Sequence, residues 1–287
     1  MTSFPTTGPI TADVDLAWGD VTVLAAPGSA TEVEVAPTDP SNDKDVKAAE
    51  DTTVTCTDGR LRVAGPRNRT GVLNKKYGSV QIQVRLASGS RLDVTTGMGA
   101  ITASGSLGDC RAKTSAGDVQ VEEVRDADLR TGLGAVVARD IAGAARCSTG
   151  SGSLDIGRIG GRAEVKNSNG STRIGEAEDG LRAKSANGDI VVGRTVGEVT
   201  ATTANGSLSV ASAEQGSVTL RTSCGRVEVG IPEGTAALLD LRTSFGSVVN
   251  ELETVAQPSA AERTLEVHAQ TSAGDIVVRR APGADES

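Results

Sequence analysis

A short phrase recurs along most of this chain at nearly constant spacing, and this repeat limits the possible folds more than any other feature. The phrase Thr-Ser-Ala-Gly-Asp-(Ile/Val)-x-Val occupies residues 114–121 and returns at 271–278. Related phrases between them share its glycine, which we call the corner glycine. Successive corner glycines lie 17 to 19 residues apart at first, and the last two steps are 21 and 28 residues; the ten are Gly99, Gly117, Gly134, Gly152, Gly170, Gly188, Gly206, Gly225, Gly246 and Gly274. So regular a period is typical of a solenoid, in which each repeat packs on its neighbours.

Apolar and polar side chains alternate on both sides of each corner glycine. The positions two and four after it are mainly aliphatic, and the positions seven and five before it are apolar in all ten repeats. Alternation with a period of two is typical of a strand with one buried face. A weaker apolar position, seven or eight residues after the glycine, runs from Leu107 to Val196. The pattern predicts an all-β, single-stranded β-solenoid (β-helix) with about 18 residues per coil, right-handed as strand crossovers usually are.

The corner between the two strands carries its own pattern. Thr, Ser or Asn stands three residues before every corner glycine, and such side chains can form hydrogen-bonded ladders along a stack of strands. The residue just before the glycine is large and apolar in several coils, and we interpret this column as corner packing rather than a ligand site; its members include Trp18, Tyr77, Met98, Leu133 and Phe245. The outward position six before the glycine alternates in charge from Asp93 to Arg182, which predicts ion pairs between neighbouring coils.

The regularity of the repeat divides the chain. Residues 1–90 predict irregular coils with loop insertions, continuous with a regular solenoid over 91–280, and residues 281–287 predict a frayed tail. Gly19, Gly59 and Gly78 share the corner pattern in the first part, and residues 37–51 predict a polar loop with one helical turn. No capping helix follows the last coil, so we expect an open end near Val278.

The composition argues against catalysis and against cofactors. One histidine, His268, excludes a two-histidine metal site within one chain. Four aromatic residues give little surface for stacking bases or sugars, and a net charge of −8 disfavours nucleic acid. We expect no cofactor, no metal and no small-molecule ligand. Asp118, Asp189 and Asp275 lack the calcium-binding repeat pattern and are interpreted as polar corner residues.

The four cysteines, Cys56, Cys110, Cys147 and Cys224, lie far apart in the sequence. Their spacing favours scattered buried thiols over a zinc site or a disulfide framework. The first ten residues lack the basic and apolar regions of a signal peptide, and no apolar run is long enough to span a membrane. A cytoplasmic location is therefore expected.

Two groups of cations are candidate binding surfaces. The first, the basic stripe, is the outward column four residues before the corner glycine and holds Lys113, Arg130, Lys166, Lys184, Arg221 and Arg242. The second, the basic loop, lies in residues 64–76 and holds Arg67, Arg69, Lys75 and Lys76 without an acid. A cationic surface on an acidic protein favours an acidic partner or an anionic polymer, although solvation alone also explains such charges.

The repeated Thr-x-Ser-x-Gly-(Asp/Ser)-(Ile/Val)-x-Val resembles a bacterial "putative adhesin" β-strand-repeat family of unknown function. Residues 9–23 (PITADVDLAWGDVTV) and 84–99 (VRLASGSRLDVTTGMG) are similar to its actinobacterial members, and the resemblance covers about residues 8–280. It implies a β-strand repeat architecture and an adhesin-like role, and no catalytic residues.

These observations predict a non-enzymatic β-solenoid scaffold or protein-binding, adhesin-like module. The alternative is a self-assembling cytoplasmic β-helical filament or oligomer, similar to bactofilins. A carbohydrate-active enzyme using Glu122 and Glu123 is a third hypothesis. The expected partner is a protein or a second copy of the chain.

Overall fold

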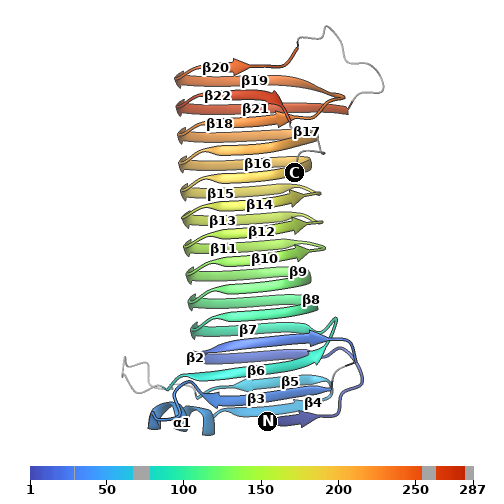
Figure 1. The fold of residues 1–287 in the computed structure, drawn as a ribbon, viewed down its shortest axis with the longest axis vertical. Helices are drawn as coiled ribbons and strands as arrows, with labels where there is room; N and C mark the ends of the chain where they lie inside the picture. Colours follow the sequence, from blue (N-terminus) through green and yellow to red (C-terminus); the bar gives the residue numbers. More distant parts are fainter. Residues whose placement is uncertain (29, 67–77, 254–262, 282–287) are drawn as a thin grey trace. The chain divides into compact units, whose positions relative to one another are not determined.

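The structure, a computed structural model, describes residues 1–28, 30–66, 78–253 and 263–281. Parallel strands stacked in register make up most of it (Figure 1). The chain divides into two compact units, Met1–Ile141 and Ala142–Ser287, each described here by itself. The predicted all-β class and its solenoid-like parallel repeat are confirmed; the handedness stays a prediction.

Unit 1 holds two stacks of strands joined at the corner. Its elements are β1 (Thr2–Phe4), β2 (Thr11–Ala26), β3 (Thr31–Pro37), α1 (Asp43–Glu50), β4 (Thr53–Thr57), β5 (Arg60–Ala64), β6 (Val80–Ala87), β7 (Arg91–Met98), β8 (Ile101–Ala116), β9 (Val119–Leu133) and β10 (Val136–Ile141). One stack runs β4, β5, β2, β7, β8, β9. The other runs β1, β3, β6, β2, β8, β9, β10. The long strands β2, β8 and β9 contribute to both stacks, and β2 lies inside the unit although it is near the start of the chain.

The first layers of unit 1 depart from the parallel repeat. Strand β3 is antiparallel to β1 and β6, and β4 is antiparallel to β5. Asp58 and Gly59 have positive φ between β4 and β5, so they form a two-residue hairpin turn, for which Asp-Gly is a strong signal. The prediction that Gly59 is a coil corner is therefore wrong. The same prediction for Gly78 is also wrong, because Gly78 has no positive φ and lies against α1. Gly19, with φ +148°, does occupy a corner.

Helix α1 is longer than the single turn predicted, and it packs beside β3 and β6. Asn42 caps its first turn by accepting a hydrogen bond from the Lys44 amide. Asp45 is buried, and its carboxylate accepts hydrogen bonds from the amides of Asp39 and Ser79 at 3.1 and 2.9 Å. Ala48 packs into the core with 4% of its surface exposed. The helix is thus held against β3 and β6 by one buried carboxylate and one buried alanine.

Unit 2 is more regular. Its strands are β11 (Ala145–Ser151), β12 (Leu154–Ile159), β13 (Ala163–Asn169), β14 (Thr172–Ala177), β15 (Leu181–Asn187), β16 (Ile190–Asn205), β17 (Leu208–Cys224), β18 (Val227–Ile231), β19 (Thr235–Phe245), β20 (Val248–Asn250), β21 (Arg263–Ala273) and β22 (Ile276–Arg280). One stack runs β11, β13, β15, β16, β17, β21, β19. The other runs β12, β14, β16, β17, β18, β22, β20.

The last coils of unit 2 do not stack in sequence order. Strands β21 and β22 lie between β17–β18 and β19–β20, as Figure 1 shows. The expected open end near Val278 is therefore wrong, because Val278 is fully buried and paired on both sides. The last segment carries the complete phrase of the repeat and fills an interior layer. The coil of β19 and β20, with Asn250 at an apolar position, is left outermost.

The core follows the predicted columns. Around Gly188 and Gly206, for example, Ile190, Val192, Val199 and Ala201 are at most 1% exposed. The predicted third inward position is wrong in one coil. Thr195, not Val196, pairs in register with the buried Ala177 and Ala213. Thr195 is 1% exposed, and Val196, predicted to be inside, is half-buried.

The corner is stabilised by bonds between neighbouring coils. Threonine side chains three before the glycine donate to the carbonyl of the adjacent corner glycine, as Thr222 does to Gly206 at 2.9 Å. These threonines form the predicted hydrogen bonds along the stack, with a backbone carbonyl as the acceptor. Asp118 and Asp189 each accept a hydrogen bond from a backbone amide of the next coil, at 2.8 and 2.7 Å. Their interpretation as polar corner residues is confirmed.

Candidate binding surfaces

Parallel in-register pairing places equivalent outward residues of successive coils side by side, about 4.8 Å apart. In unit 1 this brings together two members of the basic stripe, since Lys113 on β8 is paired with Arg130 on β9. The Arg130 guanidinium donates two hydrogen bonds to the Asp128 carboxylate, at 2.6 and 2.9 Å. Lys113 makes no ion pair with any described residue, so it is the available cation of this pair.

In unit 2 the basic stripe is interrupted. Lys166 and Lys184 are neighbours in register, but Thr202 follows them, and Gln270 of the inserted strand β21 separates Arg221 from Arg242. The four cations therefore do not form one continuous row.

Two of these four cations are also neutralised by an acid two residues earlier on the same strand. Lys166 pairs with Glu164 at 2.5 Å, and Arg242 pairs with Asp240 at 2.9 Å. The hydrogen bond from Lys166 lowers the pKa of the Glu164 carboxyl below its ordinary value. Among the described residues, Lys184 and Arg221 have no such partner, so the cationic surface is smaller than the sequence suggests.

The alternating charges six before the corner glycine pair across coils within each unit. Arg111 lies 3.7 Å from Asp93 and 3.8 Å from Asp128 in unit 1. Arg146 lies 3.3 Å from Glu164 in unit 2. These exposed pairs confirm the predicted contacts, although pairs of this kind add little stability. The basic loop, with Arg67, Arg69, Lys75 and Lys76, lies outside the described residues.

The residues before the corner glycines form an exposed apolar surface in unit 1. Pairing of β2 with β7, β7 with β8 and β8 with β9 aligns Trp18, Met98, Ala116 and Leu133. Trp18 is 37% exposed, Met98 53% and Leu133 60%. We call these three residues the corner ridge. Their interpretation as corner packing is wrong because the corner turns these side chains outward, and Tyr77 lies outside the described residues.

Three successive coils of unit 2 carry asparagine at the same position: Asn169, Asn187 and Asn205. The Asn187 amide donates to the Asn169 side-chain carbonyl, and the Asn205 amide donates to that of Asn187, each at 2.9 Å. Beyond Asn205 the same column holds Cys224, Ala273 and Phe245 in register, and the amide ladder ends there. Cys224 is exposed, so its prediction as a buried thiol is wrong, whereas Cys110 and Cys147 are buried.

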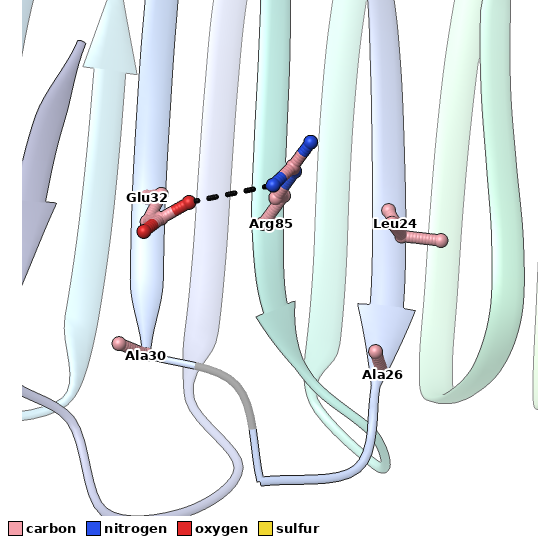
Figure 2. Close-up of a pocket in the computed structure, with 5 residues that line it drawn as sticks. All are labelled: Leu24, Ala26, Ala30, Glu32 and Arg85. Atoms are coloured by element: carbon pink, nitrogen blue, oxygen red, sulfur yellow. Dashed lines mark ion pairs between the residues drawn. The ribbon is translucent and has the colours of Figure 1, made fainter.

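A shallow hollow of about 340 Å³ lies on the outer face of unit 1 (Figure 2). Leu24 on β2 and Ala26 form its apolar side, and Ala30 lies opposite them. Arg85 on β6 and Glu32 on β3 face each other with 3.8 Å between guanidinium and carboxylate. The charges are thus already paired with each other, and the hollow offers a small apolar contact rather than a catalytic site.

Glu122, one of the two carboxylates considered for catalysis, has structural contacts, whereas Glu123 is exposed. Glu122 accepts a hydrogen bond from the Gly105 amide at 2.8 Å and another from Arg139 at 3.1 Å. Among residues 1–28, 30–66, 78–253 and 263–281, no group of three His, Cys, Asp or Glu residues is placed to hold a metal ion. No helix in the described part of the chain is long and apolar enough to cross a membrane.

Comparison with known proteins extends the resemblance. Solved structures with 12% identity include an adhesin described as putative from Bacteroides fragilis (96% of this chain, 95% of that chain, TM-score 0.33). The match to a putative cell adhesion protein from Clostridium sporogenes covers 96% of this chain and 94% of that chain, with 12% identity and a TM-score of 0.22. The match to a putative lipid binding protein from Parabacteroides distasonis covers 96% of this chain and 95% of that chain, with 12% identity and a TM-score of 0.41. No curated protein matches. The family profile described as Toastrack DUF4097 matches residues 14–280. The predicted resemblance to an adhesin-like repeat family is confirmed, and the chain belongs to the Toastrack DUF4097 family.

Proposed function

We propose that the chain is a non-enzymatic, adhesin-like scaffold that binds a protein partner through unit 1. The observation that carries this proposal is the corner ridge, where Trp18, Met98 and Leu133 are aligned in one exposed column. Soluble proteins rarely expose contiguous large apolar side chains without an interaction to cover them. Tryptophan is also enriched among residues that dominate binding energy at protein interfaces.

The charge beside the corner ridge indicates the chemistry of the partner. Lys113 lies on β8, three residues before Ala116, the member of the aligned column between Met98 and Leu133. A partner with apolar side chains flanked by a carboxylate would cover the ridge and pair with this lysine. Burying the ridge supplies most of the affinity, at roughly 25 cal/mol for each Å² of apolar surface, while the charge favours the correct orientation.

The finer parts of the proposal rest on the sequence. We propose a right-handed, single-stranded solenoid of about 18 residues per coil in a cytoplasmic protein. The absence of enzymatic activity is supported by the engagement of Glu122 in backbone and arginine hydrogen bonds.

A capture experiment tests the role of the corner ridge. The immobilised full-length chain is compared with the variant Trp18→Ser/Met98→Ser/Leu133→Ser in native lysate, followed by mass spectrometry. The control variant Val137→Ser/Val191→Ser changes two valines that are each 37% exposed elsewhere. The proposal expects at least one protein that the wild type and the control retain and the ridge variant loses by about tenfold or more, which corresponds to about 1.4 kcal/mol. Equal capture by all three proteins would contradict it.

Self-assembly is the second candidate function, and a different observation favours it. The outermost coil of unit 2, β19 and β20, has one unpaired edge among the described residues. Pairing of this edge with a second copy of the chain would give an oligomer.

A further inference from the structure

The outer edge of β19 and β20 is the most exposed strand edge of unit 2. We call these two strands the terminal coil. β19 is paired with β21 and β20 with β22, and neither is paired with another described strand. Figure 1 shows both strands beyond β21 and β22 at the end of the stack. Unpaired backbone amides and carbonyls along such an edge can form a ladder with another chain.

Apolar side chains accompany this edge. Leu238 is 70% exposed, Phe245 79% and Val248 46%. Leu241 points inward but is only half-buried, whereas its in-register neighbour Ala269 on the covered strand β21 is 2% exposed. The terminal coil therefore leaves the core of unit 2 open on the side where another coil would lie.

We propose that two copies of this chain pair through their terminal coils, with the two β19 strands antiparallel about a two-fold axis at Leu241. In this register Leu241 faces Leu241 of the second copy, and Asp240 faces Arg242 of the second copy. Residues directly opposite in an antiparallel pair lie on the same face, so inward side chains meet inward side chains. Phe245 then lies opposite Ala237, a large residue against a small one.

Charge decides between this register and its neighbours. An axis at Asp240 places two carboxylates opposite each other, and an axis at Arg242 does the same with two guanidinium groups; like charges directly opposite are destabilising. If the axis lies between Leu241 and either neighbour, Leu241 is opposite a charged residue. Inward residues of one copy then face outward residues of the other, so one core face is turned to solvent. With the axis at Leu241, Asp240 of each copy faces Arg242 of the other. Within one strand, Asp240 and Arg242 already form an ion pair at 2.9 Å, so all four charges alternate in sign. This self-complementarity favours a second copy over an unrelated strand.

The N-terminal layers explain why the assembly stops at two copies. In unit 1, the outermost strands β1 and β4 each have one edge unpaired among the described strands, but both are antiparallel to their neighbours, and α1 packs beside β3 and β6. No equivalent parallel coil is left open there among the described residues. Pairing of identical terminal coils thus gives a closed dimer rather than an open filament. The inference does not depend on the corner ridge, so a ridge variant should still dimerise.

Sedimentation equilibrium of the full chain measures the predicted state. The wild type should have a mass of about 58 kDa, twice 29.0 kDa. Asp240→Arg and Arg242→Asp should each reduce the mass to that of a monomer, and the double variant Asp240→Arg/Arg242→Asp should restore the dimer. Arg221→Asp, on the covered strand β17, should leave it intact. A monomeric wild type, a mass that grows beyond the dimer with concentration, or failure of the double variant to restore the dimer would overturn the proposal.

Crosslinking tests the register separately. In a Cys224→Ser background, Leu241→Cys places two thiols at the two-fold axis, where opposed Cα atoms lie about 4.5 to 5.5 Å apart, within the range of a disulfide. Oxidation should give a covalent dimer on a non-reducing gel. Leu238→Cys, which faces Ser244 of the second copy, should give little. Equal crosslinking at both positions, or none at position 241 in a folded dimeric protein, would refute the register.

Discussion

A methyl group at a corner glycine should destabilise the protein far more than a methyl group at another glycine with positive φ. Gly188 has φ +142°, and an added Cβ would lie 2.1 Å from the Gly170 carbonyl oxygen. Ordinary contact begins at 3.4 Å, so the carbonyl of the neighbouring coil must move by about 1.3 Å, over a quarter of the roughly 4.8 Å spacing between coils. Backbone strain of about 1–3 kcal/mol and the loss of one or two hydrogen bonds worth about 1 kcal/mol each together predict a cost of about 2–5 kcal/mol.

Gly180→Ala is the matched control, because Gly180 lies eight residues earlier in the same unit. It has φ +76°, and the nearest atom to an added Cβ is the Arg162 Cγ at 3.6 Å, an ordinary contact. The substitution should therefore cost about 1–2 kcal/mol, the conformational penalty alone.

Urea and thermal unfolding followed by circular dichroism compare the two variants. A loss of 1 kcal/mol lowers Tm by roughly 2–4 °C in a unit of 150–250 residues. Gly188→Ala should thus melt about 10 °C below the wild type and Gly180→Ala about 4 °C below it. Equal losses for the two variants would refute the reasoning, because they would mean that the coils separate without significant cost.

Individual contacts lead to four further predictions. Thr222→Val removes a hydroxyl that donates to a carbonyl at 2.9 Å and should cost about 1 kcal/mol. Thr195→Val removes a buried hydroxyl with no partner among the described residues and should instead be neutral or stabilising in the same urea titration. Cys224 should react with a thiol reagent in the native protein, whereas Cys110, whose pKa burial raises to about 12, should react only after unfolding. Asp109, whose pKa is lowered by a guanidinium hydrogen bond, contributes stability above its ordinary pKa of 3.8 that is lost as pH falls further. Asp109→Asn should therefore reduce the acid sensitivity of Tm.

The interior of the protein could be predicted because each coil repeats one physical requirement. A position that points inward in one coil points inward in the next, so the apolar columns identify buried residues such as Ile190 and Val199. Thr172 stands at the position two after the corner glycine, where the other coils carry an aliphatic residue. This exception has a local reason. Its neighbour Asn167 replaces the usual threonine at the corner, and its amide lies 3.5 Å from the Thr172 hydroxyl. The two polar residues occur in the same coil and partly satisfy each other.

The order of the coils at the chain ends could not be predicted from the columns. All repeats share the same pattern, so the pattern does not say which coil lies beside which. Pairing of Val227 with Ile276 joins residues 49 positions apart, and it places Val248 outside them. The turn at Asp58 and Gly59, in contrast, could have been predicted. Asp-Gly is a hairpin signal in its own right, but the residues around Gly59 also match the corner pattern.

The basic stripe shows the same limit. Lys166 and Lys184 are adjacent because their strands are consecutive in the stack. Arg221 and Arg242 are separated because β21 inserts Gln270 between them. The neutralising acids, in contrast, could have been identified, since Asp240 and Arg242 are two residues apart and share one face of the strand.

The two units differ at one structurally equivalent position, and this difference argues for where binding occurs. Interior positions and corner glycines are fixed by packing, so variation that carries function is expected on outward and corner side chains. In unit 2, Asn187 is bonded on both sides to other asparagines of the ladder, which leaves little hydrogen-bonding capacity for a partner. In unit 1 the equivalent Met98 and Leu133 have no polar groups and more than half of each surface exposed. Removing apolar surface from water is favourable. Covering the corner ridge with a partner therefore lowers the free energy more than covering the asparagine ladder does.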